Sequence, residues 1–580
     1  MKNQLIKIKN RQIWKTFVAY PAAAFVILQA VDFFIINYGL DAKWLTLSLI
    51  ILSGGFLIAL LWNWNHGEKG IQKFTNKERF LYVLIAVITL LFGTNYWVNS
   101  ELKGEGVRPG DELVYNKLAI LPFDNQSDDA SLKYLSDGIP ENFINRLSRS
   151  TNLKVLSRNS TFILEDTDRN SMGVKEKLGA DLMLTGRIEQ SDSTLSVNCQ
   201  LVDVTEGIQV WCERIYYDRE DILELEESIV SSLLKSLPDS SKKPVKLEKV
   251  TGSANAEAQA HFMKGRALSY GSTKEEAEKA LDHFRQAIEI DPKFAAAYVA
   301  IANEKIIQAM FSTATREEIF NEARTAVQTA LAFDPNSADA YYVDGAIKFY
   351  GNLNWDEAEE SYKKSIAINP YNANAYIRYS AFLGAMKRHD ESLIMAEKAI
   401  ALDPISISSL HNLGWVNLIA DNFAESEEAF TEALDLHPNW IWGYVKRAYA
   451  RSFQKKYELA EADAEKAREL IGPWGSELLE AAIIFIYDNC ENEPMKNQLI
   501  KRYFEKVNRD NYHDPFAVFY VHYINGDMEL ALDWAEITLK EKSPGLYQFN
   551  IDLFVKEDLL KQPRFIKIME EMNFPKQETS

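Results

Sequence analysis

Cysteine is scarce in this chain: there are 3 cysteines among 580 residues, and no two of them form a C-x-x-C pair. So few thiols exclude a disulfide framework and a zinc site built on cysteine pairs. Lysine and arginine number 64 against 83 for aspartate and glutamate, which leaves a formal net charge of −19. Nucleic-acid binding depends on cationic side chains that neutralise phosphates, so we expect no nucleic-acid partner.

Motifs that carry common catalytic chemistry are also missing. The sequence contains no G-x-x-x-x-G-K-[ST], G-x-G-x-x-G, H-E-x-x-H or G-x-S-x-G pattern. Its 8 histidines are scattered along the chain rather than clustered. We therefore expect no enzyme activity, no cofactor and no metal site.

Long apolar runs are present at the start of the chain, at about residues 14–38, 44–62 and 80–98. Each is close to the roughly 20 residues that a helix needs to span a bilayer. Lysine and arginine gather before the first run and between the second and third, as expected of cytoplasmic segments. We predict a membrane unit with three transmembrane helices over residues 1–99 and a cytoplasmic amino terminus. Everything after about Ser100 then lies on the outer side of the membrane, which in a Gram-negative cell is the periplasm.

Two points in this unit stay open. If residues 80–98 formed a buried helix instead of a span, the body of the protein would be cytoplasmic. Asp32 places an ionisable side chain within the first apolar run, which is costly in a bilayer. It either bonds to Ser48, Thr46 or a water near the outer end of the span, or it is an intramembrane polar site with a signalling or ion role.

Residues 100–114 are predicted to form a linker. Residues 115–238, in the middle of the chain, are predicted to form an α/β domain. Its apolar patterns predict the element order βαβαβββα, which is typical of an α/β sandwich. If the last hairpin turn places Thr205 opposite Ile208, Cys199 faces Arg214 and Cys212 lies diagonal to it. That geometry is marginal for a disulfide, so we expect two buried thiols.

The second half of the chain repeats a short phrase that ends in proline. It reads AIEIDP, ALAFDP, SIAINP, AIALDP and ALDLHP, and successive prolines are 43, 35, 34 and 34 residues apart. A period near 34 is typical of stacked helix–turn–helix units. Small residues recur twelve before and ten after each proline, where two helices would cross closely. They are Ala280, Ala323, Ala358, Ser392 and Ser426, and Ala302, Gly345, Ser380, Gly414 and Ala448.

These phrases resemble the tetratricopeptide repeat (TPR) consensus. The resemblance implies an all-α TPR solenoid of five or six units over residues 253–473, after a linker at 239–252. A helical extension and cap would follow over residues 474–580. Such arrays hold other molecules on a concave wall, and an aromatic wall suits an extended peptide or a helix.

By the TPR offsets, one set of side chains would line this groove. It comprises Tyr342, Phe349, Tyr350, His411, Trp415, Leu418, Ile419, Trp442, Tyr449 and Phe453. The alternative is that several of them pack between repeats. The Lys/Asn clamp with which some TPR proteins hold a peptide carboxylate is not visible, so we do not expect recognition of a chain terminus.

Longer phrases resemble a bacterial family. The runs NRQIWKTFVAYPAAAFVILQAVDFF and GGFLIALLWNWNHGEKGI are similar to its two-helix membrane module. The phrases LAILPFDNQSDD, YLSDGIPENFINRLS and LKVLSRNSTF resemble the TolB-amino-terminal-like domain that follows, which implies an envelope-associated, non-catalytic module. Some members of the wider group carry a nucleotide cyclase domain in front. This sequence opens at the module, so we expect no cyclase domain here.

Together these patterns indicate a multidomain protein: a three-helix membrane anchor, a TolB-amino-terminal-like α/β domain and a TPR solenoid. The expected function is an inner-membrane-anchored, periplasm-facing scaffold that binds a partner protein or peptide. Whether it also forms a homo-oligomer stays open. The alternative is a signalling or regulatory protein, related to membrane-bound nucleotide cyclase proteins but lacking their catalytic domain.

Overall fold

The computed structural model divides into two compact units, residues 1–113 and 114–580. The described residues are most of 115–575 and scattered positions from 20 to 89. The gaps after residue 115 fall at 127–132, 192–193, 219–221, 238–252, 254, 270–273, 312–315, 472–475, 508–513, 544 and 552.

In the smaller unit, the described residues are helical apart from Thr75. The Tyr20 hydroxyl donates to the Leu52 carbonyl over 2.9 Å, and its ring centroid lies 5.3 Å from that of Phe56. Within the described residues, no helix combines the length and apolar content that a bilayer crossing requires. Most of the three predicted spans, including Asp32, lie outside the described residues.

The larger unit begins with a mixed sheet. Its strands are β1 (Lys117–Ile120), β2 (Asp124–Asn125), β3 (Lys154–Val155), β4 (Leu182–Ser191), β5 (Thr194–Asp203) and β6 (Ile208–Asp218). The strand order is β3-β1-β4-β5-β6, with β2 paired to β4. Strand β1 runs parallel to β3 and β4, whereas β4, β5 and β6 form an antiparallel meander. The order of the main elements agrees with the predicted βαβαβββα.

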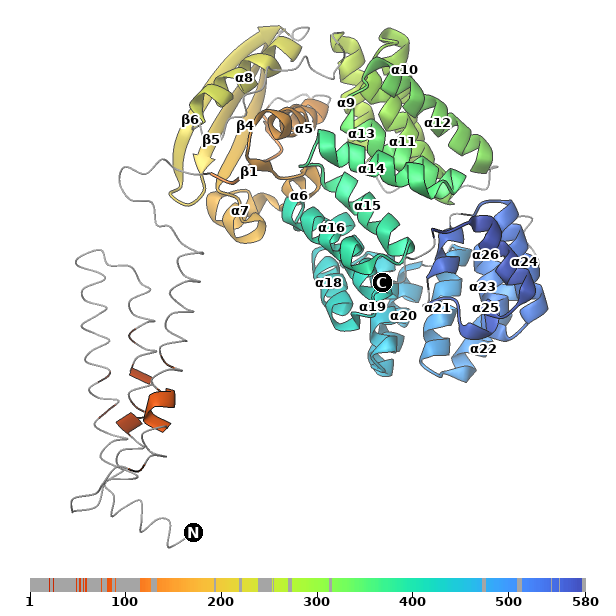
Figure 1. Ribbon diagram of the computed structural model, residues 1–580. Coiled ribbons are helices and arrows are strands. Elements are labelled where there is room, and N and C mark those ends of the chain that lie inside the picture. Colours follow the sequence, from red (N-terminus) through yellow and green to blue (C-terminus); the bar gives the residue numbers. More distant parts are fainter. Residues whose placement is uncertain are drawn as a thin grey trace. The chain divides into compact units, whose positions relative to one another are not determined.

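Helices cover both faces of this sheet (Figure 1). They are α5 (Lys133–Ser150), α6 (Arg158–Phe162), α7 (Ser171–Leu178) and α8 (Ile222–Ser236). Helix α7 packs with Ala119 and Met183, while the alternate residues of β1 and β4, such as Leu118 and Leu184, are fully buried on the other face. Each strand therefore contributes apolar side chains to both faces, as expected of a covered sheet.

The β5–β6 hairpin corrects the predicted cysteine geometry. Asp203 pairs with Ile208, a bulge follows at Leu201/Val202, and Cys199 then faces Glu213 instead of Arg214. Cys212 faces Gln200, so it projects from the sheet on the opposite side from Cys199. Cys199 is buried and Cys212 is exposed, and both thiols are free. The prediction of two buried thiols is wrong for Cys212. The turn is longer than predicted, with Asp203 and not Thr205 opposite Ile208, and this two-residue shift keeps each side chain on its face. The bulge then shifts the register by one residue, which turns Cys212 to the other face.

The repeats form six helix pairs within the described residues. They are α9 (Ala256–Ser269) with α10 (Lys274–Ile290), α11 (Ala295–Phe311) with α12 (Arg316–Phe333), α13 (Ala338–Ile347) with α14 (Trp355–Ile368), α15 (Ala373–Ala385) with α16 (His389–Leu402), α17 (Ile407–Ile419) with α18 (Phe423–Leu436), and α19 (Ile441–Phe453) with α20 (Tyr457–Ile471). Each recurrent proline lies in the turn after the second helix of a pair.

Two further pairs continue the stack beyond the periodic phrases. They are α21 (Glu477–Asn489) with α22 (Glu493–Val507) and α23 (Pro515–Asn525) with α24 (Met528–Lys540). The chain ends with η6 (Leu546–Asn550), α25 (Glu557–Leu560) and α26 (Pro563–Met572). Arg564 on α26 pairs with Glu529, Asp533 and Glu536 of α24, which attaches the tail to the end of the stack.

Small side chains lie where the helices of a pair cross, as predicted. A Cβ added to Gly414 would stand 2.8 Å from the ring of Phe430, so only glycine fits there without a shift. Ser380 and Ser392 are fully buried, and each hydroxyl donates to the other residue's carbonyl, over 2.7 and 2.8 Å. These bonds satisfy both hydroxyls and join the two helices of the fourth pair.

The sheet and the helices that cover it, from β1 to α8, are called the sheet region. The sheet region packs against the stack of helix pairs at two separate places. Helix α5 lies against α9, where Glu141 pairs with Arg266. Helix α6 lies against the turn between α16 and α17, where the Ser160 hydroxyl donates to the buried Asp403 carboxylate and the Ser157 amide donates to the Leu402 carbonyl over 3.2 Å. The sheet region thus bridges the first repeat to the fourth and fifth repeats.

Inside the sheet region, Glu226 on α8 is fully buried and accepts a hydrogen bond from the Asn142 side chain over 2.7 Å. Burial raises the pKa of this carboxyl to about 7, from an ordinary value of 4.5. Between pH 4.5 and about pH 7, the Glu226 carboxyl keeps its proton in the folded chain but has released it in the unfolded chain. The contribution of Glu226 to stability is therefore complete at low pH and is lost as the pH rises through about 7.

We predict that Glu226→Gln removes this pH dependence. Relative to the native chain, the variant's free energy of unfolding should rise by up to about 3 kcal/mol between pH 4.5 and pH 8. Urea unfolding of both proteins at several pH values measures the difference, with Glu224→Gln on the exposed side of the same helix as the control. If the difference in free energy of unfolding between the variant and the native chain stayed constant with pH, the raised pKa of Glu226 would be contradicted.

Candidate functional site

A cavity of about 420 Å³ lies in the wall formed by the first helices of successive pairs, α15, α17, α19, α21 and α23. Gly545, Tyr547, Gln548 and Phe554 of the carboxyl-terminal segment form its remaining side. Five of the residues predicted for the groove line this cavity. They are Tyr350, His411, Trp415, Trp442 and Tyr449. We call it the aromatic cavity.

The other predicted groove residues do not line the aromatic cavity. Phe349 and Leu418 are 1% and 0% exposed and belong to the packing between repeats. Ile419 is also buried, and Phe453 stacks on Phe423 with ring centroids 5.0 Å apart. Tyr342 lines a different cavity, described below. The structure therefore divides the predicted set between the two alternatives that the sequence left open.

Lys446 lines the aromatic cavity but was not among the residues predicted for the groove. Lys446 Nζ lies 3.9 Å from the ring centroid of Trp415, 5.2 Å from that of Tyr449 and 5.6 Å from that of Trp442. An ammonium over aromatic faces gains an electrostatic attraction. Lys446 follows its repeat proline by eight residues, as Asn412 and Arg378 follow theirs, and this shared offset was the signal available in the sequence.

Burial governs the charges in the aromatic cavity. It lowers the pKa of Lys446 to about 7. Burial and the neighbouring Lys446 lower the pKa of His411 to about 3, so this imidazole is neutral at physiological pH. His411 packs edge-on against Trp440, with ring centroids 5.5 Å apart, and acts as another aromatic surface.

The carboxyl-terminal segment folds back onto this wall. The ring of Phe554 stacks on Trp415 with centroids 6.1 Å apart, and it meets the edge of Tyr449 at the same distance. Tyr547 contacts Phe349 and Tyr350 with centroids 5.5 and 5.9 Å apart. The tail was predicted to cap the solenoid, and here it also packs against the middle repeats.

Two contacts fasten the tail to the third and fourth repeats. The Trp355 indole donates to the Met572 carbonyl over 2.9 Å, and its ring stacks on Phe574 with centroids 4.8 Å apart. The Asn550 side chain donates to the Ala385 carbonyl over 2.8 Å. These contacts hold residues 546–574 across the wall.

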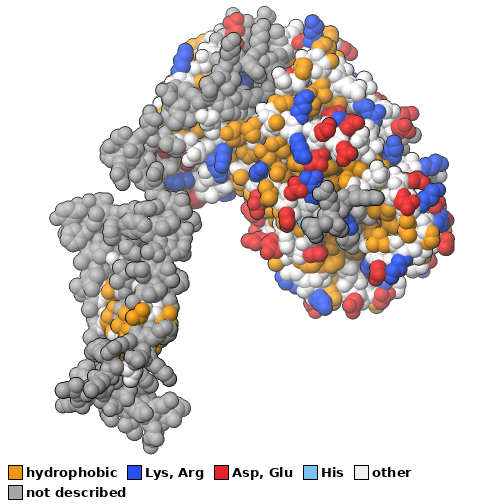
Figure 2. Space-filling view, viewed as in Figure 1, with side chains coloured by type: hydrophobic (Ala, Val, Ile, Leu, Met, Phe, Trp, Pro, Cys, Tyr) orange, Lys and Arg blue, Asp and Glu red, His pale blue; other side chains and the backbone are white. Residues whose placement is uncertain are grey.

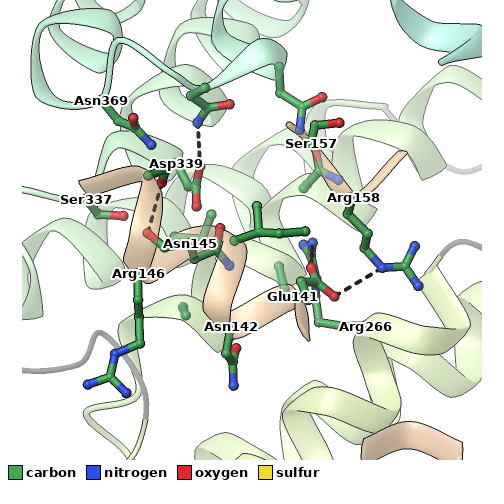
Figure 3. Close-up of a pocket in the computed structure, with 18 of the residues that line it drawn as sticks. Glu141, Asn142, Asn145, Arg146, Ser157, Arg158, Arg266, Ser337, Asp339 and Asn369 are labelled. Carbon is green, nitrogen blue, oxygen red and sulfur yellow. Dashed lines mark hydrogen bonds and ion pairs between the residues drawn. The ribbon is translucent and has the colours of Figure 1, made fainter. Parts of the chain in front are cut away.

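A second, smaller cavity of about 190 Å³ lies between the sheet region and the stack. Figure 3 shows Glu141 lying between Arg158 and Arg266, which come from the sheet region and from α9. Nearby, Asp339 accepts a hydrogen bond from the Asn372 side chain over 2.7 Å. These polar groups bind one another, so the cavity is part of the docking of the sheet region on the stack.

Two further observations concern the surface charge and the possible metal ligands. On the face shown in Figure 2, acidic and basic side chains of the larger unit are interspersed and form no broad basic surface. In the part of the chain that the structure describes, no group of three or more His, Cys, Asp or Glu is placed to hold a metal ion.

Comparison with known proteins identifies similar segments. A family model described as the second domain of HilA/YgeH-like transcriptional regulators matches residues 114–232. The putative adenylate cyclase 3 of Rhizobium meliloti is 29% identical over 194 residues, 32% of this chain and 32% of that protein. The small glutamine-rich tetratricopeptide repeat-containing protein 2 of Saccharomyces cerevisiae is 29% identical over 111 residues, 19% of this chain and 32% of that protein.

The type IV pilus assembly protein PilF of Pseudomonas aeruginosa is 31% identical over 160 residues, 26% of this chain and 63% of PilF. A solved structure of this PilF aligns at 18% identity and a TM-score of 0.28, covering 48% of this chain and 97% of that one. The matches span between about a third and somewhat under two thirds of the length of these curated relatives. The 34-residue period, the paired helices and the similarity to a TPR protein show that the array is a TPR-type solenoid.

We predict that Trp355→Ala releases the tail from the wall. The change removes a buried hydrogen bond and a ring stack, together worth about 2 kcal/mol. Hydrogen exchange of residues 546–572 in the full chain should then become roughly 30-fold faster.

The control for this experiment is Ile566→Ala, which removes an apolar side chain that is 43% exposed on α26. It should leave the exchange of the same residues unchanged. Equal exchange in Trp355→Ala and the native chain would show that the tail is held by other contacts.

Proposed function

We propose that this protein is a scaffold, anchored in the bacterial inner membrane, that binds a partner polypeptide on the inner wall of its TPR solenoid. The protein faces the periplasm and has no catalytic activity of its own. The sheet region is a TolB-amino-terminal-like module that holds one side of the solenoid in place.

The aromatic cavity is the observation that supports this function best. Trp415, Trp442 and Tyr449 come from helices one repeat apart and line one hollow in the wall. Tryptophan and tyrosine are the side chains that contribute most to binding energy at protein interfaces. The relative PilF is named a pilus assembly protein, and a role in assembly is compatible with a scaffold that holds other proteins.

The amino-terminal apolar runs support anchoring in the membrane. Their lengths suit bilayer spans, and the flanking lysines and arginines favour a cytoplasmic amino terminus. Among the described residues of this unit, Leu81, Val83 and Leu84 are 38%, 61% and 40% exposed. Adjacent exposed apolar side chains on a helix suit a lipid environment better than water.

A signalling role is the second candidate. The similarity to a putative adenylate cyclase and the match of residues 114–232 to a domain of transcriptional regulators both favour it. In that case the solenoid would report partner binding to the membrane unit instead of assembling partners.

The binding wall can be tested by photo-cross-linking in cells. We expect a photoreactive phenylalanine analogue at Trp442 to cross-link the full chain to a discrete partner band. The same analogue at Ile394, which is 49% exposed on α16, should give no such band because no residue of that helix lines the cavity. A Trp415→Ala change beside the probe should weaken the band several-fold, as expected for an interface anchor.

Equal cross-linking from both probes, or a band that Trp415→Ala leaves unchanged, would contradict binding at this wall.

Topology is tested separately with reporter fusions. Alkaline phosphatase, which is active only in the periplasm, should be active when fused after Ser100 and after Leu237. β-Galactosidase, which is active only in the cytoplasm, should be inactive at the same positions. The reverse pattern would support two spans and place the solenoid in the cytoplasm.

A further inference from the structure

We propose that His261 and His283, on the two helices of the first repeat pair, bind a divalent transition-metal ion and that Glu257 supplies a third ligand. Zinc is the ion whose usual ligands match this set. These three residues do not line the aromatic cavity, so the site is separate from the wall proposed to bind a partner. The sequence predicted no metal site because its histidines are spread along the chain.

The fold brings the two histidines together. His261 lies on α9 and His283 on α10, 22 residues apart in sequence, and their Nδ1 atoms are 3.1 Å apart. The ring centroids lie 5.3 Å apart, with an interplanar angle of 45°. Two nitrogens that bind one zinc ion at the tetrahedral angle, each about 2.0–2.1 Å from it, are about 3.3 Å apart. The observed spacing is therefore close to that of two ligands of one ion.

Both imidazoles are in the protonation state that binds metals. Burial lowers the pKa of His261, and the neighbouring Lys264 adds to this effect. Burial also lowers the pKa of His283, with further contributions from His261 and Lys264. Since the ordinary value is 6.5, both rings are neutral at pH 7. A metal ion therefore displaces no charge-bearing proton from either ring.

Metal binding would replace the contact between the two rings. In that contact one Nδ1 carries a hydrogen and the other accepts it. A neutral imidazole can carry its hydrogen on Nε2 instead, which leaves the Nδ1 lone pair for a metal. With both rings in this tautomer, the two Nδ1 atoms can no longer bond to each other, but both can bind one ion.

Glu257 is placed to complete the ligand set. It is exposed on α9, four residues before His261, and residues four apart on a helix are neighbours on its surface. Its charge opposes the lowering of the His261 pKa. Rotation of the Glu257 side chain would bring its carboxylate to an ion held by the two rings. Two histidines, one glutamate and a solvent molecule make a four-coordinate zinc site.

Solvent access and the surrounding charges set the affinity. Both histidines are partly exposed, so an ion can reach them from solvent. Lys264 repels a cation, although its Nζ lies over the ring of Tyr134, 5.1 Å from the centroid. Asp282 lies next to His283 and pairs with Arg285 over 2.9 Å. A neutral side chain in place of Lys264 should therefore strengthen metal binding.

A bound ion would join the two helices of the first repeat. Helix α9 also carries Arg266, which pairs with Glu141 of the sheet region. The metal would thus stabilise the repeat against which the sheet region packs.

The test measures zinc binding by the full chain at pH 7, in competition with a chromophoric chelator. We expect His261→Gln and His283→Gln each to lose one bound zinc ion per chain. The matched control is His522→Gln, because the His522 Nδ1 also has a close partner, but this partner is the Asp527 carboxylate, 3.3 Å away. This variant should bind zinc as the native chain does.

Two further variants test the charges around the ion. Glu257→Gln should weaken zinc binding several-fold, because it removes an anionic ligand. Lys264→Gln should strengthen binding several-fold, because it removes a repelling charge. A gain in affinity cannot arise from misfolding, so Lys264→Gln keeps the test decisive if a histidine variant does not fold.

Hydrogen exchange locates the ion. Zinc should slow the exchange of amides in α9 and α10 of the native chain and should leave the exchange in His283→Gln unchanged. Zinc binding that both histidine variants retain, or a native chain that binds no zinc at micromolar concentration, overturns the metal site. Partner cross-linking at Trp442 tests the binding wall separately.

Discussion

The geometry of the inner wall depends on contacts between parts of the chain that are far apart in sequence. In a repeat solenoid each unit normally contacts its neighbours, so small changes at each interface add up along the stack. Here the buried Asp403 carboxylate and Ser160 join the fourth repeat to the sheet region, which also binds the first repeat through Glu141 and Arg266. Burial raises the pKa of Asp403, and the hydroxyl and amide donors around this carboxyl group oppose that shift.

The tail provides the second long-range constraint. Trp355 holds the end of α26 on the third repeat, while Phe554 and Tyr547 pack on the wall beside the aromatic cavity. The sheet region and the tail thus bridge different sets of repeats, and between them they fix the curvature. A wall that is already fixed loses less conformational entropy when a partner binds, which favours affinity. The aromatic cavity depends on the position of the tail, because Gly545, Tyr547, Gln548 and Phe554 form one of its sides.

Local features of the fold follow from the sequence, whereas the long-range ones do not. The 34-residue period places Gly414 and Ser380 at helix crossings, because a close crossing needs a small residue whatever surrounds the pair. The cysteine register failed because the turn pairs Asp203 instead of Thr205 with Ile208 and because no local signal marks the bulge at Leu201/Val202. Phe349 was assigned to the groove by regular helical offsets, but it lies in the π-helical turn η4 (Lys348–Asn352), which changes the direction of the side chains that follow α13.

In the candidate site, too, some residues were predictable from the sequence and others were not. The aromatic residues were identified from their repeat offsets, but the position of the Lys446 ammonium among Trp415, Trp442 and Tyr449 became visible only with the neighbours in place. The central claim is that the sheet region and the tail hold the wall in one curvature. Electron-spin distance measurement tests it most directly, with labels at Gln286 on α10 and Leu459 on α20 of the full chain, after replacement of the exposed Cys212. The account predicts one narrow distance distribution that broadens when Asp403→Leu breaks the contact with Ser160. A distribution that is already broad in the native chain, or one that Asp403→Leu leaves narrow, would contradict it.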